Sequence, residues 1–264
     1  MKTKSTIRII SIFAAITFSM NSCTQVFEYS PYDAAVSSRL LNQLFADEVE
    51  GMQMTGDTLR FALFADSHSY FDQLKEAVKS INSRENVSFA ICAGDVADAG
   101  LSYQFEQYAD IIESCKYPVF TAIGNHDHRS SGSIIYERLF GSPNTSFVYG
   151  QYKFVFFDDV VWEKQRDEPD FDWLARQLDD TSHLNILITH VTPWDDQFTT
   201  QMTERYAQVV RSDNTLLCLH GHEHNFDDKM YNGIRTIISG SVEREKYNEI
   251  TIIGREINNE RISY

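Results

Sequence analysis

Side chains of the kinds that bind metal ions follow five apolar segments of the sequence. The segments end in the motifs DSH, GD, GNHD, TH and GHEH, which contribute Asp66, His68, Asp95, Asn125, His126, Asp127, His190, His222 and His224. Each motif alone is a common turn or cap, but five of them at five segment ends are hard to attribute to coincidence. Carboxylates, an amide and imidazoles without a thiolate suit divalent Mn, Fe or Zn, with Ni and Co as further candidates.

These candidate ligands are too many for a single tetrahedral zinc ion, but they suffice for two ions that share a carboxylate. Pairs of ions held ~3.5–4 Å apart serve in-line displacement at phosphorus. The predicted chemistry is therefore metal-dependent hydrolysis of a phosphoric ester.

The elements that must position these residues alternate along the first half of the chain, which favours parallel strand pairing. Apolar strands are predicted at 59–65, 87–93, 117–123 and 184–190, in the run from Asn214, in a hairpin around Gly150-Gln151, and in short C-terminal segments separated by turns such as Asn258-Asn259. Helices are predicted near 34–45, 70–83, 101–115, 133–140, 172–178 and 203–211. Ligands of open α/β sheets bind beyond the carboxyl ends of strands, so the polar turns are expected to meet at one edge.

In this order, the motifs resemble those of the calcineurin-like metallophosphoesterase superfamily, over residues 59–240 or so. The resemblance implies an α/β fold, a two-sheet sandwich flanked by helices. It also implies a role for each motif residue. Asp66, His68 and His224 would hold the first ion, Asn125, His190 and His222 would hold the second, and Asp95 would bridge both.

The same resemblance implies that His126 faces the leaving oxygen of the substrate. Asp127 would orient His126 through a hydrogen bond, and Asp98 would do similar work nearby. Two dications offset by two carboxylates leave net positive charge for a phosphate, and a hydroxide shared by the ions would attack phosphorus. The predicted substrate is a small phosphoester, with a phosphodiester favoured over a phosphomonoester because no capping domain is evident. The alternative is a membrane-anchored metal-containing binding protein without turnover.

The N-terminus reads as a bacterial lipoprotein signal. Three basic residues, Lys2, Lys4 and Arg8, precede a short apolar run, and Cys23 follows Ser22. The expected organisation is a signal peptide at 1–22, a tether with a helical segment at 23–57, and a metallophosphoesterase domain at 58–264. Lipidation at Cys23 would anchor the domain outside the cytoplasm, at a periplasmic or cell-surface face of a membrane.

Composition restricts the class of partner. The formal charge is −15, and it becomes about −18 when the three basic residues of the signal are removed. Such a charge argues against binding to duplex nucleic acid, including a nuclease role. Hydrophobic residues make up 42% of the chain, which is enough for a globular core.

The sequence allows two interpretations of several residues near the motifs. Arg129 contacts a substrate phosphate or, as favoured here, is an exposed turn residue, and His128 is expected to be solvated. Trp194 and Phe198 stack on a substrate or pack in the core. Cys92 and Cys218 are expected to be buried free thiols.

Overall fold

The computed structural model describes residues 30, 32–54, 56–211 and 213–264. The chain divides into two units, Met1–Asp33 and Ala34–Tyr264, and the second carries all the motifs. The predicted signal peptide and Cys23 lie outside the described residues. Among the described helices, none has the length and hydropathy needed to span a bilayer.

One sheet of the larger unit has five strands in the order β11-β10-β1-β2-β3. Its strands are β1 (Thr58–Phe64), β2 (Phe89–Cys92), β3 (Val119–Thr121), β10 (Lys246–Ile253) and β11 (Glu256–Ser263). The first three run parallel, whereas β10 pairs antiparallel with both β1 and β11. The parallel order of β1, β2 and β3 sets the turns after them side by side.

The other sheet has six strands in the order β4-β5-β6-β7-β9-β8. Its strands are β4 (Thr145–Tyr149), β5 (Tyr152–Phe156), β6 (Leu184–Ile188), β7 (Thr215–His220), β8 (Asp227–Tyr231) and β9 (Ile234–Ile238). The strands β5, β6, β7 and β9 are parallel, and an antiparallel strand closes each edge. Both sheets are thus mixed.

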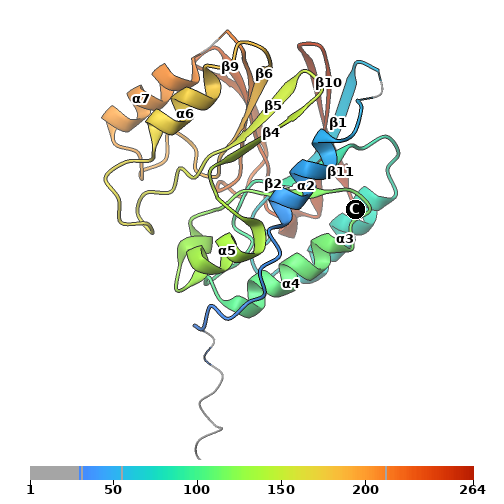
Figure 1. The fold of residues 1–264 in the computed structure, drawn as a ribbon, viewed down its shortest axis with the longest axis vertical. Coiled ribbons are helices and arrows are strands. Elements are labelled where there is room, and N and C mark those ends of the chain that lie inside the picture. Colours follow the sequence, from blue (N-terminus) through green and yellow to red (C-terminus); the bar gives the residue numbers. More distant parts are fainter. Residues whose placement is uncertain (1–29, 31, 55, 212) are drawn as a thin grey trace, which may run out of the picture. The chain divides into compact units, whose positions relative to one another are not determined.

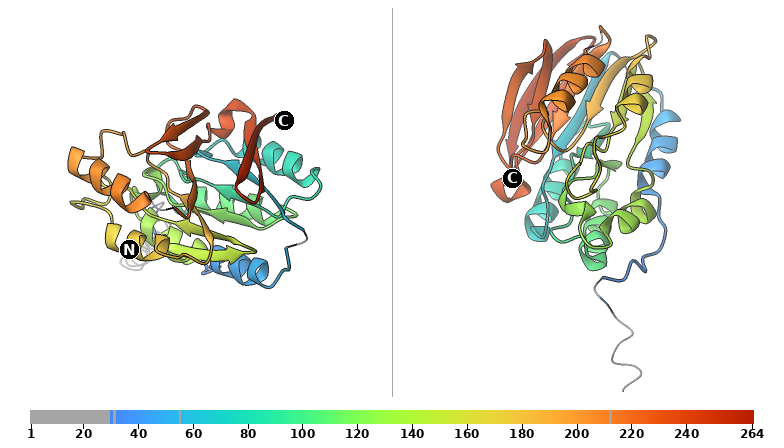
Figure 2. Two further views of the ribbon diagram at one scale, coloured as in Figure 1. Left: turned by 90° about the horizontal axis from the view of Figure 1, so that it is seen from above. Right: turned by 90° about the vertical axis from the view of Figure 1, so that its left-hand side faces the viewer.

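The helices α3 to α7 cover the outer faces of the two sheets, as Figure 1 and Figure 2 show, and α2 packs along the edge strands β3 and β4. Their bounds are α2 (Leu41–Glu50), α3 (Phe71–Asn82), α4 (Ser102–Glu113), α5 (Gly132–Phe140), α6 (Phe171–Leu178) and α7 (Thr200–Val210). Short 3₁₀ turns lie at His126–His128 and Val242–Arg244. The architecture is the predicted α/β sandwich of two sheets flanked by helices.

Three apolar clusters hold these layers together. One lies between the five-stranded sheet and α3, α4 and α5, and another lies between the six-stranded sheet and α6 and α7. The central cluster fills the space between the sheets and is rich in aromatic rings. Phe89 stands at its centre, with ring centroids 5.7 Å from Phe61 and 5.0 Å from Phe154. Burial of such large side chains fixes the two sheets face to face.

Three expectations about the elements were wrong. The N-terminal helix begins at Leu41, because the backbone N–H groups of Arg39 and Leu40 donate to the carbonyl of Arg138 at the end of α5 instead of to their own chain segment. The pair Asn258-Asn259 lies inside β11, and the turn falls at Gly254 (φ 60°). The strand β8 was not foreseen, since it is a largely exposed edge strand without an apolar alternation.

Candidate metal centre

The predicted ligands all follow strands, and they come together from both sheets. Asp66, Asp95 and Asn125 stand after the parallel strands β1, β2 and β3, and the three histidines of the TH and GHEH motifs follow β6 and β7. Backbone bonds lock the turns to each other: the N–H of Asp66 donates to the carbonyl of Gly94 and that of His68 to Asp95.

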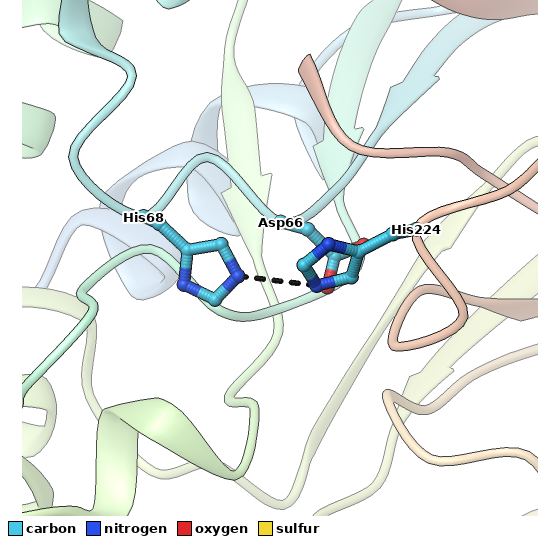
Figure 3. Close-up of side chains that lie close together, drawn as sticks. All are labelled: Asp66, His68 and His224. Carbon is cyan, nitrogen blue, oxygen red and sulfur yellow. Dashed lines mark hydrogen bonds and ion pairs between the residues drawn. The ribbon is translucent and has the colours of Figure 1, made fainter. Parts of the chain in front are cut away.

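The first-ion group, which consists of Asp66, His68 and His224, forms a tight cluster in Figure 3. The Nε2 atoms of the two imidazoles are 3.3 Å apart. The Nε2 atom of His224 is also 3.6 Å from Oδ1 of Asp66. These three side chains can hold one divalent ion.

The second-ion group, which consists of Asn125, His190 and His222, lies beside it. The Nδ1 atom of His222 is 3.2 Å from Oδ1 of Asn125, and the rings of His222 and His190 have centroids 5.2 Å apart. Asp66 and Asp95 also lie within ligand range of His190.

Asp95 stands between the two groups. Its Oδ2 atom is 3.8 Å from Nε2 of His68 and 3.3 Å from Nε2 of His190. Its other oxygen accepts from the backbone N–H of His126 at 2.9 Å. One carboxylate oxygen therefore faces one histidine of each ion group, which is the placement a bridging ligand needs.

Five of the predicted ligands have a backbone conformation that L-residues rarely adopt. The φ angles are 51° for Asp66, 42° for His68, 57° for Asp95, 70° for His222 and 54° for His224. Each such residue costs of order 1–3 kcal/mol, and such costs gather where function demands a particular side-chain direction. Gly124 leaves room for the carboxylate of Asp95, because a Cβ atom at this position would lie 2.2 Å from Oδ1 of Asp95. Gly94, just before Asp95, has a φ of 97°, a conformation that glycine adopts without strain.

Hydrogen bonds at the outer ring atoms leave lone pairs directed at the centre. The carbonyl of Ala93 can only accept, so Nδ1 of His190 carries the proton in their 2.7 Å contact. The Nε2 atom of His190 is then an acceptor that faces the carboxylate of Asp95. This Nε2 atom and the Oδ2 atom of Asp66 are both buried without a hydrogen-bond partner. Orphaned buried acceptors that face each other are expected only where a cation or a proton joins them.

The spacing of these acceptors also fits metal ligation. Two atoms bonded to one zinc-like ion at ~2.1 Å, with an angle of roughly 90–110° between the bonds, are ~3.0–3.4 Å apart. The pairs His68–His224, His190–Asp95 and His222–Asn125 measure 3.3, 3.3 and 3.2 Å. The residues present therefore fit two divalent ions.

Burial and mutual attraction shift the pKa values of these groups. Burial lowers the pKa of His68 to about 4 and also lowers the pKa values of His222 and His224, so the three rings are neutral at pH 7. Burial raises the pKa of Asp66 to about 8. Burial opposes a charge on His190, but attraction to Asp95 outweighs it and raises the pKa of His190 to about 10. Ion binding must displace the protons that these last two groups hold.

His126 lies at the rim of this cluster, with its ring centroid 4.7 Å from that of His68. Its side chain is 23% exposed, so it is accessible to a substrate. The Nδ1 atom donates to the carbonyl oxygen of Asp98 at 2.8 Å, and a carboxylate oxygen of Asp98 is 3.4 Å away. Nδ1 therefore carries a proton, and Nε2 is the ring nitrogen that can bind or release a proton.

The expected hydrogen bond from Asp127 to His126 is absent from the hydrogen bonds of the described residues, which corrects that prediction. The buried carboxylate of Asp127 instead accepts from three backbone N–H groups, those of Asp95, Ala97 and Gly124, at 3.0, 2.9 and 2.8 Å. Asp127 thus holds the turns together, and the neighbour of His126 is Asp98.

Other residues near the motifs have clear positions. His128 is buried, contrary to the expectation of a solvated ring, and it lies between Ser133 (2.8 Å) and Asp158 (3.4 Å). Arg129 is exposed, and its guanidinium donates to the carbonyl of Asp98 at 3.2 Å. Phe198 packs in the cluster under α6 and α7, whereas Trp194 is half-buried beneath Lys229, whose Nζ is 3.8 Å from the ring centroid. Cys92 and Cys218 are buried free thiols, as predicted.

Three carboxylates that contact predicted ligands were not singled out from the sequence. Glu163 accepts from Nδ2 of Asn125, Asp195 contacts Nε2 of His222, and Asp159 accepts from the backbone N–H of His190. They occur in acidic loop segments with no regular spacing. The one signal that would have found them is the need of each ligand for an outer hydrogen-bond partner.

Comparisons with known proteins give the same fold. A family model of the calcineurin-like phosphoesterases matches residues 59–226. No curated protein matches the sequence. Solved structures that resemble the chain include the protein TT1561 of Thermus thermophilus, with 13% identity and a TM-score of 0.55 over 77% of this chain and 98% of that one.

Two further structures are similar at the level of fold. One is GAP50, described as the anchor in the inner membrane complex of Plasmodium, with 15% identity and a TM-score of 0.58 over 78% of this chain and 84% of that one. The other is the NAD nucleotidase of Haemophilus influenzae, with 12% identity and a TM-score of 0.51 over 78% of this chain and 49% of that one.

Proposed function

Because the chain belongs to the calcineurin-like phosphoesterase family, we propose that it is a two-metal hydrolase of phosphoric esters that favours diesters over monoesters. The observation that carries the proposal is the position of Asp95, whose Oδ2 faces His68 of the first-ion group and His190 of the second. Ions bound by these groups would neutralise phosphoryl oxygens and lower the pKa of a water nucleophile.

The chain's own residues supply orientation and a proton. The backbone carbonyl of Asp98 holds the His126 ring through Nδ1, which leaves Nε2 free at the rim of the ion groups. A protonated Nε2 can donate to the oxygen that leaves phosphorus, a step that typically contributes 10²–10⁴-fold to a rate. Arg129, whose guanidinium shares the Asp98 carbonyl with His126, adds one positive charge at the same rim.

Charge around the site supports the preference for diesters. Four carboxylates, those of Asp98, Glu163, Asp195 and Glu223, contact ligands or their neighbours at the edge of the site. A phosphomonoester carries a charge near −2 at neutral pH, because its second pKa is ~6, whereas a diester carries −1. Repulsion by the carboxylates therefore costs a monoester more.

The test uses matched model substrates. Purified protein is stripped of metal, reloaded with Mn, and assayed with bis-p-nitrophenyl phosphate and p-nitrophenyl phosphate. The expected result is a higher kcat/KM for the diester. Absence of turnover with any divalent metal would refute the hydrolase, and a higher kcat/KM for the monoester would refute only the substrate preference.

A second test separates turnover from metal binding. The substitution His126→Ala should reduce kcat by about 10²-fold or more, as loss of a general acid does, while both ions stay bound. His183→Ala is the matched control, because that imidazole pairs with Asp180 at 3.0 Å, just before β6 and therefore at the end of this strand opposite His190. Unchanged kcat in His126→Ala would refute the role of His126 as the general acid. Native protein that binds both ions but shows no turnover would favour the metal-containing binding protein, which no observation on the described residues supports.

We also propose that residues 1–22 direct export and that Cys23 carries a lipid anchor. The support is the order of the segments: three basic residues, the apolar run at 9–20, and then Cys23. Fractionation of cells should place the protein with membranes, and Cys23→Ser should release it. Equal membrane association of both forms would exclude Cys23 as the anchor.

A further inference from the structure

Two carboxylates from loops outside the motifs contact two ligands of the second-ion group. The Oε1 atom of Glu163 accepts from Nδ2 of Asn125 at 2.9 Å. The Oδ2 atom of Asp195 lies 3.0 Å from Nε2 of His222. Within the described residues, no carboxylate makes a comparable contact with an outer atom of His68 or His224 in the first-ion group.

These contacts decide which atoms face the ion. A carboxylate only accepts, so Asn125 must turn its amide nitrogen to Glu163 and its oxygen inward. By the same rule His222 carries its proton on Nε2, toward Asp195, and its Nδ1 holds a lone pair. The inward Oδ1 and Nδ1 are 3.2 Å apart, and neither can donate to the other. A cation bound between these two acceptor atoms would turn their repulsion into attraction.

Gln197 joins the loops that carry the two carboxylates. Its Oε1 accepts from the backbone N–H groups of Val161 at 3.2 Å and of Trp162 at 3.4 Å, just before Glu163. Its own backbone N–H donates to Oδ1 of Asp195 at 2.9 Å. Because Gln197 is only 4% exposed, water competes little for these bonds.

The loop around Glu163 is also held by two ion pairs with Asp158. Buried Asp158 binds Nζ of Lys164 at 2.7 Å and Nη2 of Arg166 at 2.9 Å, on the residues that follow Glu163. Hydrogen bonds thus connect Asn125 to Glu163, the backbone just before Glu163 to Gln197, Gln197 to Asp195, and Asp195 to His222. The inward contact between the two ligand acceptor atoms closes this ring.

We propose that Glu163 and Asp195 are positioning residues for the second ion and that Gln197 locks them into one unit. The ring orients the acceptor atoms of Asn125 and His222 and leaves the first-ion group untouched. The inference rests on the proposed function, because it assigns these ligands to a second divalent ion.

The experiment measures metal binding directly on the full chain. Mn content after dialysis is determined by elemental analysis, and the affinity of each ion by calorimetry. In Glu163→Leu the second ion should bind about 10- to 100-fold more weakly, the usual effect of removing an outer partner, and the first ion should bind as in the native protein. Glu163→Gln retains an acceptor for Asn125 and should stay within about 3-fold of native binding.

Further variants test the link and the specificity. Gln197→Leu should weaken the second ion in the same way, and combining it with Glu163→Leu should add less than the sum of the two effects. Glu168→Gln, on the same loop but 46% exposed and paired with Arg205, is the matched control and should change nothing. Circular dichroism and thermal melting verify folding, and Gln197→Leu carries the test alone if Glu163→Leu does not fold.

The outcomes separate this inference from the proposed function. Native affinity for both ions in Glu163→Leu and Gln197→Leu would overturn the positioning role and leave the two-metal enzyme intact. Equal loss of both ions would also overturn it, because the residues would then support the whole site. Failure of the native protein to bind any divalent ion would instead refute the proposed function.

Discussion

Replacement of Asp127 tests whether its buried carboxylate holds the metal-binding turns together. In Asp127→Ala the backbone N–H groups of Asp95, Ala97 and Gly124 lose their acceptor. Burial, followed by the nearby charge of Asp95, raises the pKa of Asp127, whereas the backbone hydrogen bonds lower it. We count about 1 kcal/mol for each bond, or about 3 kcal/mol in total.

A loss of about 3 kcal/mol is large against the typical 5–15 kcal/mol of a domain. For a unit of this size, each kcal/mol lowers Tm by about 2–4 °C, so Asp127→Ala should melt about 6–12 °C below the native protein. Differential scanning calorimetry of the metal-free forms gives the shift without a contribution from ion binding. Asp127→Asn keeps the shape but only one carbonyl oxygen, and its shift should be intermediate.

The control is Asp98→Ala, because the Asp98 side chain is 59% exposed and contacts the His126 ring. It should leave Tm within about 1 °C, as most exposed substitutions do. It also keeps the backbone carbonyl that accepts from Nδ1 of His126. A Tm shift below about 2 °C for Asp127→Ala, or unchanged melting together with a large loss of kcat, would refute the structural role assigned to Asp127.

Two further predictions concern protons. The metal-free protein holds protons on Asp66 and His190, whose pKa values are raised to about 8 and about 10. Binding of Mn at pH 7 should therefore release about one to two protons per chain, which calorimetry in buffers of different ionisation enthalpy measures. Absence of proton release would contradict the assigned ligands. Although burial opposes its charge, the hydrogen bond to His128 and nearby cations hold the pKa of Asp158 below its ordinary value. The stability that this depressed pKa contributes is present above pH ~4 and is lost as pH falls. The difference in unfolding free energy between native protein and Asp158→Asn should accordingly shrink between pH 6 and pH 3 in urea titrations; a constant difference would show that the ionised form is not favoured by folding.

Residues that follow a strand could be predicted from the sequence because their signal is local. Asp66, Asp95 and Asn125 each come directly after an apolar run, and parallel strands bring such positions to one edge. The alternation of strands and helices likewise gave the layers of the sandwich.

Residues whose roles depend on distant neighbours could not be predicted in this way. Glu163 and Gln197 lie in loops without periodicity, and Gln197 contacts the backbone just before Glu163 only because the two loops pack together. His128 lies in a polar turn, yet the fold buries it against Asp158, 30 residues further along the chain. The start of α2 was predicted wrongly for a similar reason, because the backbone N–H groups just before it donate to the carbonyl of Arg138 in α5.

Each ion group draws its ligands from both sheets, with Asp66 and His68 on one side and His224 on the other. Neither group can assemble on a nascent N-terminal half, because His190, His222 and His224 are synthesised long after the first strands. Ions held by these groups would therefore bind only after the two halves have docked. The metal that the protein acquires would then depend on the supply at the moment and place where folding is completed.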